Sequence, residues 1–310
     1  MGWALNQGFN RNLLVQLSGG RTRYQIDVYV TARFRFFYAE GAVNWTVPET
    51  AQWKRRFINL VYHTWSEKWE LRSAINCVGV VGRVPNVILP TAKVRVHCVD
   101  FDNRSMALPQ EQRLYAIKVF RRAPGETPGQ QHASALQPSN ATVADAAAAD
   151  GGVLPLGTRE AQLYEESLEL NPRDTNQTDD NRQVSAMHEF GHLLGLMHPN
   201  DGELGCIQDI NAPICYGEPY SPDSGSIMGR GQEVRRDDYR VFVHIISRLV
   251  HETVETGMLS DSMRRLYWSV EGSQSAYCEG QNSSLARLDA EPRGTFGGAN
   301  LPGPVGCRFS

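Results

Sequence analysis

The sequence predicts an α+β fold, because segments with the two-residue period of strands are interspersed with segments that have the spacing of amphipathic helices. Residues 24–38, 94–98 and 115–119 show the strand pattern. Two longer stretches, beginning at Thr46 and near Arg235, carry apolar residues every three or four positions. We therefore expect one sheet built from these strands, together with two long amphipathic helices.

The run at 24–38 has the clearest strand pattern. Every second side chain is apolar or aromatic, and the side chains between them are mostly polar or charged. One face carries Tyr24, Ile26, Val28, Val30, Ala32, Phe34 and Phe36. This alternation predicts a long, half-buried strand. The runs at 94–98 and 115–119 predict further strands of the same sheet, and a weaker strand is expected at 161–170.

A long amphipathic helix is expected from Thr46 to about Arg72. Thr46 and Glu49 have the three-residue spacing of a capping box, which marks the beginning of a helix. Apolar residues then recur every four positions through a charged segment. They are Trp53, Phe57, Val61 and Trp65.

A second strong helix is expected after Arg235. Its apolar positions follow the helical repeat, and Gly257 is suited to end it. These positions are Tyr239, Phe242, Val243, Ile246, Leu249, Val250 and Val254. Two other segments lack periodicity: residues 122–157 predict a mobile surface loop or insertion, and residues 258–310 hold one apolar patch and a tail rich in glycine and proline.

Composition argues against two classes of partner. The chain has 31 basic and 34 acidic side chains, so its net charge of -3 gives no electrostatic reason to expect nucleic acid or an anionic membrane. Apolar stretches such as 241–246 are far shorter than the roughly 20 residues that a membrane span requires. Residues 1–14 build no apolar core of a Sec signal peptide, so we expect a removed signal or export by a non-Sec route, and an extracellular or exported location.

The six cysteines are even in number and lack the short paired spacing of a structural zinc site. Disulfides are therefore favoured, with Cys206–Cys215 and Cys278–Cys307 as the preferred pairs. Buried free thiols are the alternative, and the sequence does not fix the connectivity.

The segment 188–198, His-Glu-Phe-Gly-His-Leu-Leu-Gly-Leu-Met-His, carries the predicted chemistry. His188 and His192 share a helix face one turn apart and can bind one ion. Gly195 lets the chain leave the helix, so that His198 can return as a third ligand. Three nitrogen ligands with an open fourth position are typical of a catalytic zinc site, and we expect one zinc ion per chain.

Glu189 follows the first ligand and can reach a metal-bound water, which makes it the candidate general base. Calcium is a minor alternative cofactor, because Asp174, Asp179 and Asp180 lack EF-hand spacing. Asp180 together with Gln183 is instead interpreted as a cap of the active-site helix.

The segment 188–198 resembles the extended zinc signature of the metzincin metallopeptidases. Ser226-Ile227-Met228-Gly229 is similar to their Met-turn, in which the methionine, here Met228, underlies the imidazoles without binding the ion. The resemblance implies a metzincin-like fold: a twisted, mostly parallel sheet with two long helices as an N-terminal subdomain, an active-site cleft, and a smaller irregular C-terminal subdomain with one long helix. The corresponding parts are residues 1–198, 199–257 and an irregular extension at 258–310.

The family within this clan stays unassigned. The string His-Glu-Phe-Gly-His with a later Leu-Gly-Leu resembles matrixins and serralysins, and Pro199 is serralysin-like. However, the calcium repeats of serralysins and the cysteine-switch segment of matrixins are missing from the sequence. Arg230 stands where astacins and serralysins have a zinc-binding tyrosine, so no further ligand is expected from this turn.

The resemblance implies a zinc metalloendopeptidase that hydrolyses peptide bonds in protein or peptide substrates by Glu189-assisted attack of a zinc-bound water. Tyr216 and Tyr220 are candidate hydrogen-bond donors to the oxyanion, with surface packing as the alternative. Arg230 is a candidate for recognising acidic side chains, with a salt bridge to Asp237 or Asp238 as the alternative.

Two alternative functions remain open. A metal-containing binding or interaction module without peptidase activity is the alternative from another class. A secreted or injected toxin-like effector protease would keep the chemistry and change the substrate and location. No sequence feature indicates an oligomer, and a monomer is favoured.

Overall fold

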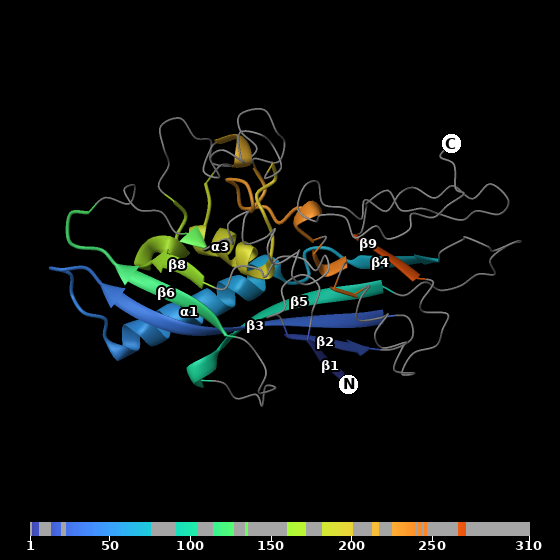
Figure 1. The fold of residues 1–310 in the computed structure, drawn as a ribbon, viewed down its shortest axis with the longest axis horizontal. Coiled ribbons are helices and arrows are strands. Elements are labelled where there is room, and N and C mark those ends of the chain that lie inside the picture. The colour runs from blue at the N-terminus through green and yellow to red at the C-terminus, as the bar shows by residue number, and fades with distance from the viewer. Residues whose placement is uncertain are drawn as a thin grey trace, which may run out of the picture.

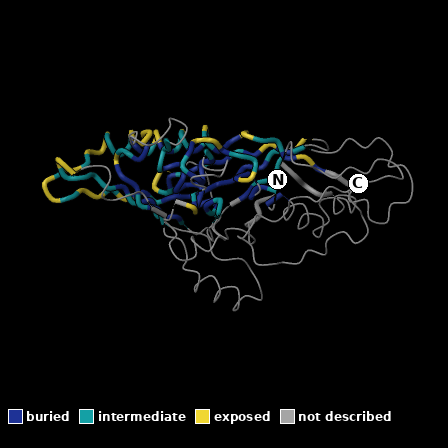
Figure 2. Tube along the Cα trace, turned by 90° about the horizontal axis from the view of Figure 1, so that it is seen from above, coloured by how far each residue is buried: buried dark blue, intermediate teal, exposed yellow. Residues whose placement is uncertain are grey.

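The computed structural model describes residues 2–5, 14–19, 23–75, 91–103, 114–126, 134–135, 160–171, 182–200, 213–216, 225–239, 241–243, 245–246 and 266–270. Within these ranges nine strands form one mixed sheet in the order β7-β8-β6-β3-β5-β4-β9, with β2 paired to β3 and β1 paired to β2 (Figure 1). Buried residues lie in the interior of the part that the structure describes (Figure 2). The predicted combination of a sheet with helices is confirmed.

The centre of the sheet is β3 (Arg23–Tyr38), which confirms the long strand predicted there. It runs parallel to β5 (Thr91–Asp100) along its first part and parallel to β6 (Tyr115–Arg121) along its second part. On its other edge, the first part also pairs with β2 (Leu14–Gly19). Both edges are paired there, and side chains on both faces are buried, including Asp27, Tyr29 and Thr31. The prediction of a half-buried strand is wrong for this part.

The four central strands, β5, β3, β6 and β8 (Glu160–Tyr164), are parallel, and the outer pairs are antiparallel. Besides β2, the outer strands are β1 (Gly2–Leu5), β4 (Leu71–Ile75), β7 (Ser134–Ala135) and β9 (Leu266–Val270). Strand β8 is shorter than predicted, because a 3-10 helix, η2 (Glu165–Leu168), follows it. The apolar patch in the C-terminal segment adds β9 to the sheet edge beside β4.

Helix α1 (Val47–Trp65) begins with the predicted capping box. The Thr46 N–H donates to Glu49 Oε2 at 2.8 Å, and the Glu49 N–H donates to Thr46 Oγ1 at 3.4 Å. The four apolar residues expected at four-residue spacing are all buried, so this face packs onto the sheet. They are Trp53, Phe57, Val61 and Trp65.

The end of α1 differs from the prediction, since the helix stops at Trp65 and not near Arg72. The Glu67 N–H donates to the carbonyl of Val94 at 2.8 Å, and the Val96 N–H donates to Ser66 Oγ at 2.9 Å. These bonds attach the chain to the open edge of β5. Glu67 turns there with φ of 52°, and β4 begins at Leu71.

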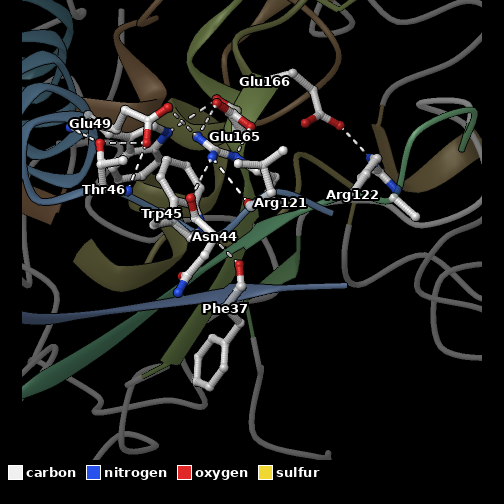
Figure 3. Close-up of polar contacts among 12 residues, drawn as sticks. Phe37, Asn44, Trp45, Thr46, Glu49, Arg121, Arg122, Glu165 and Glu166 are labelled. Carbon is white, nitrogen blue, oxygen red and sulfur yellow. Dashed lines mark hydrogen bonds and ion pairs between the residues drawn. The ribbon is translucent and has the colours of Figure 1, made fainter. Parts of the chain in front are cut away.

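Arg121 joins three elements near the N-terminal end of α1 (Figure 3). At the end of β6, its Nε donates to Glu165 Oε2 at 2.7 Å and its Nη2 to Glu49 Oε1 at 3.2 Å. Its guanidinium also lies 4.0 Å from the centre of the Trp45 ring. This arrangement holds η2, the start of α1 and the preceding loop together at one end of the sheet.

Several predictions lie partly or wholly outside the described residues. Of the expected insertion, the structure describes only 122–126 and β7. Of the helix expected after Arg235, it describes η6 (Asp237–Tyr239) and helical residues at 241–243 and 245–246. None of the helices in the described ranges is both long and apolar enough to cross a bilayer.

The predicted disulfides also reach beyond the described residues. Cys206, Cys278 and Cys307 all fall outside them, so both pairings stay predictions. Cys98, on β5, is a buried free thiol whose pKa is raised by burial. Cys215 is buried too.

Candidate metal centre

Helix α3 (Ser185–Leu194) carries the first two predicted ligands, and every residue from Ala186 to Leu194 is buried. The helix lies beside α1 (Figure 1). The rings of Phe190 and Phe57 pack edge to face, with their centres 6.0 Å apart. It ends at Gly195, whose φ of 96° is the left-handed conformation predicted for the chain reversal. The rings of His188 and His192 can therefore be approached by the chain that follows.

The structure brings the three predicted imidazoles together. The Nε2 atoms of His188 and His198 lie 3.1 Å apart, and each lies 3.2 Å from Nε2 of His192. All three side chains are buried. Within the described residues, these three form the group of side chains that could hold a metal ion.

Hydrogen bonds fix the tautomer of the two helix histidines. His188 Nδ1 lies 2.8 Å from the carbonyl of Ile227, and His192 Nδ1 lies 2.7 Å from the carbonyl of Leu196. A carbonyl only accepts, so both Nδ1 atoms carry the hydrogen and both Nε2 atoms present a lone pair when the ring is neutral. Burial lowers the pKa of His188 to about 4 and that of His192 to about 3, and it lowers the pKa of His198 further. The cluster is therefore neutral at pH 7.

This donor set fits a cation. Nitrogen lone pairs at these distances repel one another unless a positive charge lies between them. A tetrahedral zinc ion with Zn–N bonds of about 2.0–2.1 Å requires nitrogen atoms about 3.3–3.4 Å apart, close to the observed spacing. Neutral, buried imidazoles with fixed tautomers are also the form in which histidine binds transition metals. The site is therefore compatible with a metal ion held by His188, His192 and His198.

The segment after Gly225 forms a tight turn against the back of α3. Its loop is closed by hydrogen bonds from the Gly229 and Gly231 N–H groups to the carbonyl of Ser226, at 2.9 and 3.0 Å. Met228 is 1% exposed and packs against Gly191, on the helix that carries the ligands. The structure thus places the predicted methionine turn directly behind the first two histidines.

Asp238 supports this turn from the other side, a role that the sequence did not indicate. Ser226 Oγ lies 3.1 and 3.0 Å from the two carboxylate oxygens of Asp238, and the Met228 N–H donates to Ser226 Oγ at 3.1 Å. The Arg235 N–H donates to Asp238 Oδ2 at 2.7 Å. Burial raises the pKa of Asp238 to about 7. These contacts engage Asp238 within the turn.

Tyr216 lies beside the histidines, and Arg230 lies over the Tyr216 ring. Tyr216 belongs to the 3-10 helix η4 (Pro213–Tyr216), and its ring centre is 4.2 Å from that of His198 and 5.9 Å from that of His188. The Arg230 guanidinium lies 5.3 Å from the centre of the Tyr216 ring. Tyr220, the other tyrosine predicted here, lies outside the described residues. Glu189, the predicted base, is 7% exposed.

The predicted cap of α3 is not formed by Gln183. The N-cap residue is Val184, with no side-chain hydrogen bond, and Asp180 lies outside the described residues. The Gln183 side chain instead lies against the methionine turn. Sequence pattern does not reveal this contact, because its partners are more than 40 residues away along the chain.

Comparison with protein-family models, with curated proteins and with solved structures finds no match for this chain. The metzincin resemblance therefore rests on residues 188–198 and 226–229 themselves and stays an interpretation of the sequence. The structure adds an independent observation, namely that three buried histidines converge at the spacing of metal ligands.

Proposed function

We propose that this protein is a zinc metalloendopeptidase, with the ion held by His188, His192 and His198. The observation that carries the proposal is the triangle of Nε2 atoms with sides of 3.1, 3.2 and 3.2 Å. Helix α3, which carries the first two of these histidines, also carries a buried glutamate, Glu189. A purely structural zinc site closes its shell with four protein ligands, whereas three histidines leave a position for water or substrate.

The ion would supply Lewis-acid chemistry, lowering the pKa of water and polarising a carbonyl group. Glu189 is the group in this chain that would move the proton. It would accept a proton from the attacking water and return it to the nitrogen of the leaving amine. The peptide C–N bond then breaks to give a carboxylate and an amine, and no covalent bond to the protein forms.

The remaining site residues are proposed to bind the substrate. Tyr216, whose ring lies tilted beside that of His198, is suited to donate its hydroxyl hydrogen to the oxygen that gains negative charge. Arg230, over the Tyr216 ring, is suited to pair with an acidic side chain next to the scissile bond. The expected substrates are therefore proteins or peptides that carry Asp or Glu near the cut.

Digestion of a denatured proteome, read by sequencing the new peptide termini, tests this function. We expect the zinc-loaded wild type to generate new termini, and the His192→Ala variant to generate none. Both proteins should be prepared in parallel, so that a contaminating protease appears in both samples. Zinc bound in stoichiometric amount without any new termini would favour a metal-containing binding module instead.

A further inference from the structure

Gln183 lies where three parts of the site meet, although it is neither a metal ligand nor part of the sequence motif. Its side-chain Nε2 lies 2.8 Å from the carbonyl oxygen of Ile227, 3.0 Å from that of Gly229 and 3.3 Å from that of Gly231. The same nitrogen lies 3.1 Å from His188 Nδ1. One amide group thus contacts the methionine turn at three points and the first ligand at a fourth.

The donors and acceptors determine how this amide is oriented. Three carbonyl oxygens facing one point would repel one another, and an amide NH₂ group offers two hydrogens to them. The opposite orientation would place Gln183 Oε1 against the three carbonyls, so only the NH₂ group fits. His188 Nδ1 donates its own hydrogen to Ile227, and its contact with Gln183 is therefore a packing contact.

The backbone of Gln183 is fixed independently of its side chain. The Asn171 N–H donates to the Gln183 carbonyl at 2.9 Å, and the next residue, Val184, pairs with Leu170 in an antiparallel bridge. Residue 170 lies two positions after the end of η2, which follows β8. The side chain therefore links the methionine turn to a backbone that is paired with residues 170 and 171.

The carbonyl of Ile227 is the shared point of this arrangement. It accepts from Gln183 Nε2 at 2.8 Å and from His188 Nδ1 at 2.8 Å, which uses both of its lone pairs. The position of this carbonyl determines which way the His188 ring turns and which nitrogen it offers to the ion. Groups that orient metal-binding histidines in this way commonly contribute 10- to 100-fold to metal affinity.

We propose that Gln183 is a positioning residue of the metal centre: by donating to the turn carbonyls it fixes the Ile227 oxygen, and through it the orientation of His188. The inference rests on the metal site of the proposed function and adds a residue to it. It assigns to Gln183 no contact with the substrate or with the reacting atoms.

Two substitutions test this role. Gln183→Met keeps the length of the side chain and removes both donors. Gln183→Glu keeps its shape and places an oxygen atom against three carbonyl oxygens. Ser185→Ala is the matched control, because it removes an exposed hydrogen bond, from Ser185 Oγ to Asn171 Oδ1, at the same end of α3.

The readouts are the zinc dissociation constant, measured by competition with a chelator, and the visible absorption spectrum of the Co²⁺-loaded protein, which reports ligand geometry. We expect both Gln183 variants to bind zinc about 10- to 100-fold more weakly and to change the Co²⁺ spectrum. Ser185→Ala should match the wild type in both. Wild-type zinc affinity and an unchanged Co²⁺ spectrum in Gln183→Met would overturn the proposal, even if that variant melts at a lower temperature.

If the variants do not fold, a measurement on the wild type tests the hydrogen bonds of the Gln183 side chain. The two Nε2 hydrogens of Gln183 should exchange with solvent more slowly than those of an exposed glutamine. Exchange at the rate of an exposed side chain would contradict the proposed bonds. A protein that binds zinc but cleaves no peptide would end the proposed function and leave the test of Gln183 intact, whereas a wild type that binds neither zinc nor Co²⁺ would overturn both.

Discussion

Met228 and Gly191 approach each other so closely that a Cβ atom at position 191 would lie 2.2 Å from the Met228 sulfur. The same Cβ atom would lie 3.0 Å from Cζ2 of Trp65, at the end of α1. Glycine inside a helix costs about 0.5–1 kcal/mol relative to alanine. Its presence here lets the ligand helix, the methionine turn and α1 pack in contact.

Gly191→Ala should therefore destabilise the protein, although alanine favours the helix. Met228 is 1% exposed and cannot turn its sulfur out to solvent, so we expect a loss of about 1–3 kcal/mol in the free energy of unfolding. Urea unfolding measures it. Adding Met228→Ala should recover part of the loss in a double-mutant cycle. A Gly191→Ala protein at least as stable as the wild type would show that the contact is not tight.

Removing the metal should lower the stability of the protein. Elemental analysis of protein purified without chelator should find about one zinc per chain, and His192→Ala should lose most of it. A ligand present at about 1,000 times its dissociation constant stabilises the folded state by about 4 kcal/mol, so chelation should lower the melting temperature of the wild type. The His192→Ala variant is the control, because chelator should leave its melting temperature nearly unchanged. A melting temperature of the wild type that does not respond to chelator would contradict the assignment.

Glu189 should separate metal binding from chemistry. Glu189→Gln keeps the shape of the side chain and removes the basic oxygen, so we expect zinc content and binding of a peptide hydroxamate to persist. Turnover should fall by about 10² to 10⁴, the range of general-base catalysis. Glu189→Ala should behave in the same way. If either variant kept more than about a tenth of wild-type turnover, another group would have to be the base.

Asp238 should make the stability depend on pH. Its folded pKa of about 7 lies above the ordinary value of 3.8, so the folded protein binds more protons between these values. The stabilising contribution of Asp238 is complete below its unfolded pKa and is lost as the pH rises through its folded pKa. The free energy of unfolding changes with a slope of at most about 1.4 kcal/mol per pH unit.

Asp238→Asn removes this titration and keeps an acceptor for Ser226. The wild type should therefore lose stability relative to the variant between pH 4 and pH 7, in urea unfolding at several pH values. The histidines are the same in both proteins, and their contribution cancels in the difference. Identical pH dependence of the two proteins would mean that Asp238 does not titrate as its burial implies.

Arg230→Met should change the substrate preference. We expect kcat/KM for peptides with an acidic residue next to the cut to fall about tenfold or more, which corresponds to about 1.4 kcal/mol. Matched peptides with Gln in place of Glu should be cleaved at nearly the wild-type rate. An equal loss for both peptides would indicate a structural role for Arg230.

Local patterns in the sequence were sufficient where the determining contacts are local. The capping box of Thr46 and Glu49 lies within one turn of α1, and the spacing of His188 and His192 follows from the helical repeat. The left-handed Gly195 and the arrival of His198 at the cluster also depend on a few consecutive residues. These features were predicted and are confirmed.

Contacts between segments far apart in the chain could not be predicted from local sequence patterns. Strands β1, β2 and β9 are short, and each is defined by its partner in the sheet. Helix α1 was predicted to run to about Arg72, but the edge of β5 binds Ser66 and Glu67 and ends it earlier. Helix propensity does not predict this end of the helix, because the competing hydrogen bonds come from residues about 30 positions away.

The sequence by itself determined the candidate metal ligands, because three histidines and a glutamate at these offsets follow the geometry of one helix and one turn. Only the tertiary structure decided how the ligands are supported. Gln183 and Asp238 hold the methionine turn from two sides through hydrogen bonds to Ile227 and Ser226. A polar side chain can satisfy its hydrogen bonds with any suitable partner, so its partner is known only when the fold has brought distant backbone groups to it.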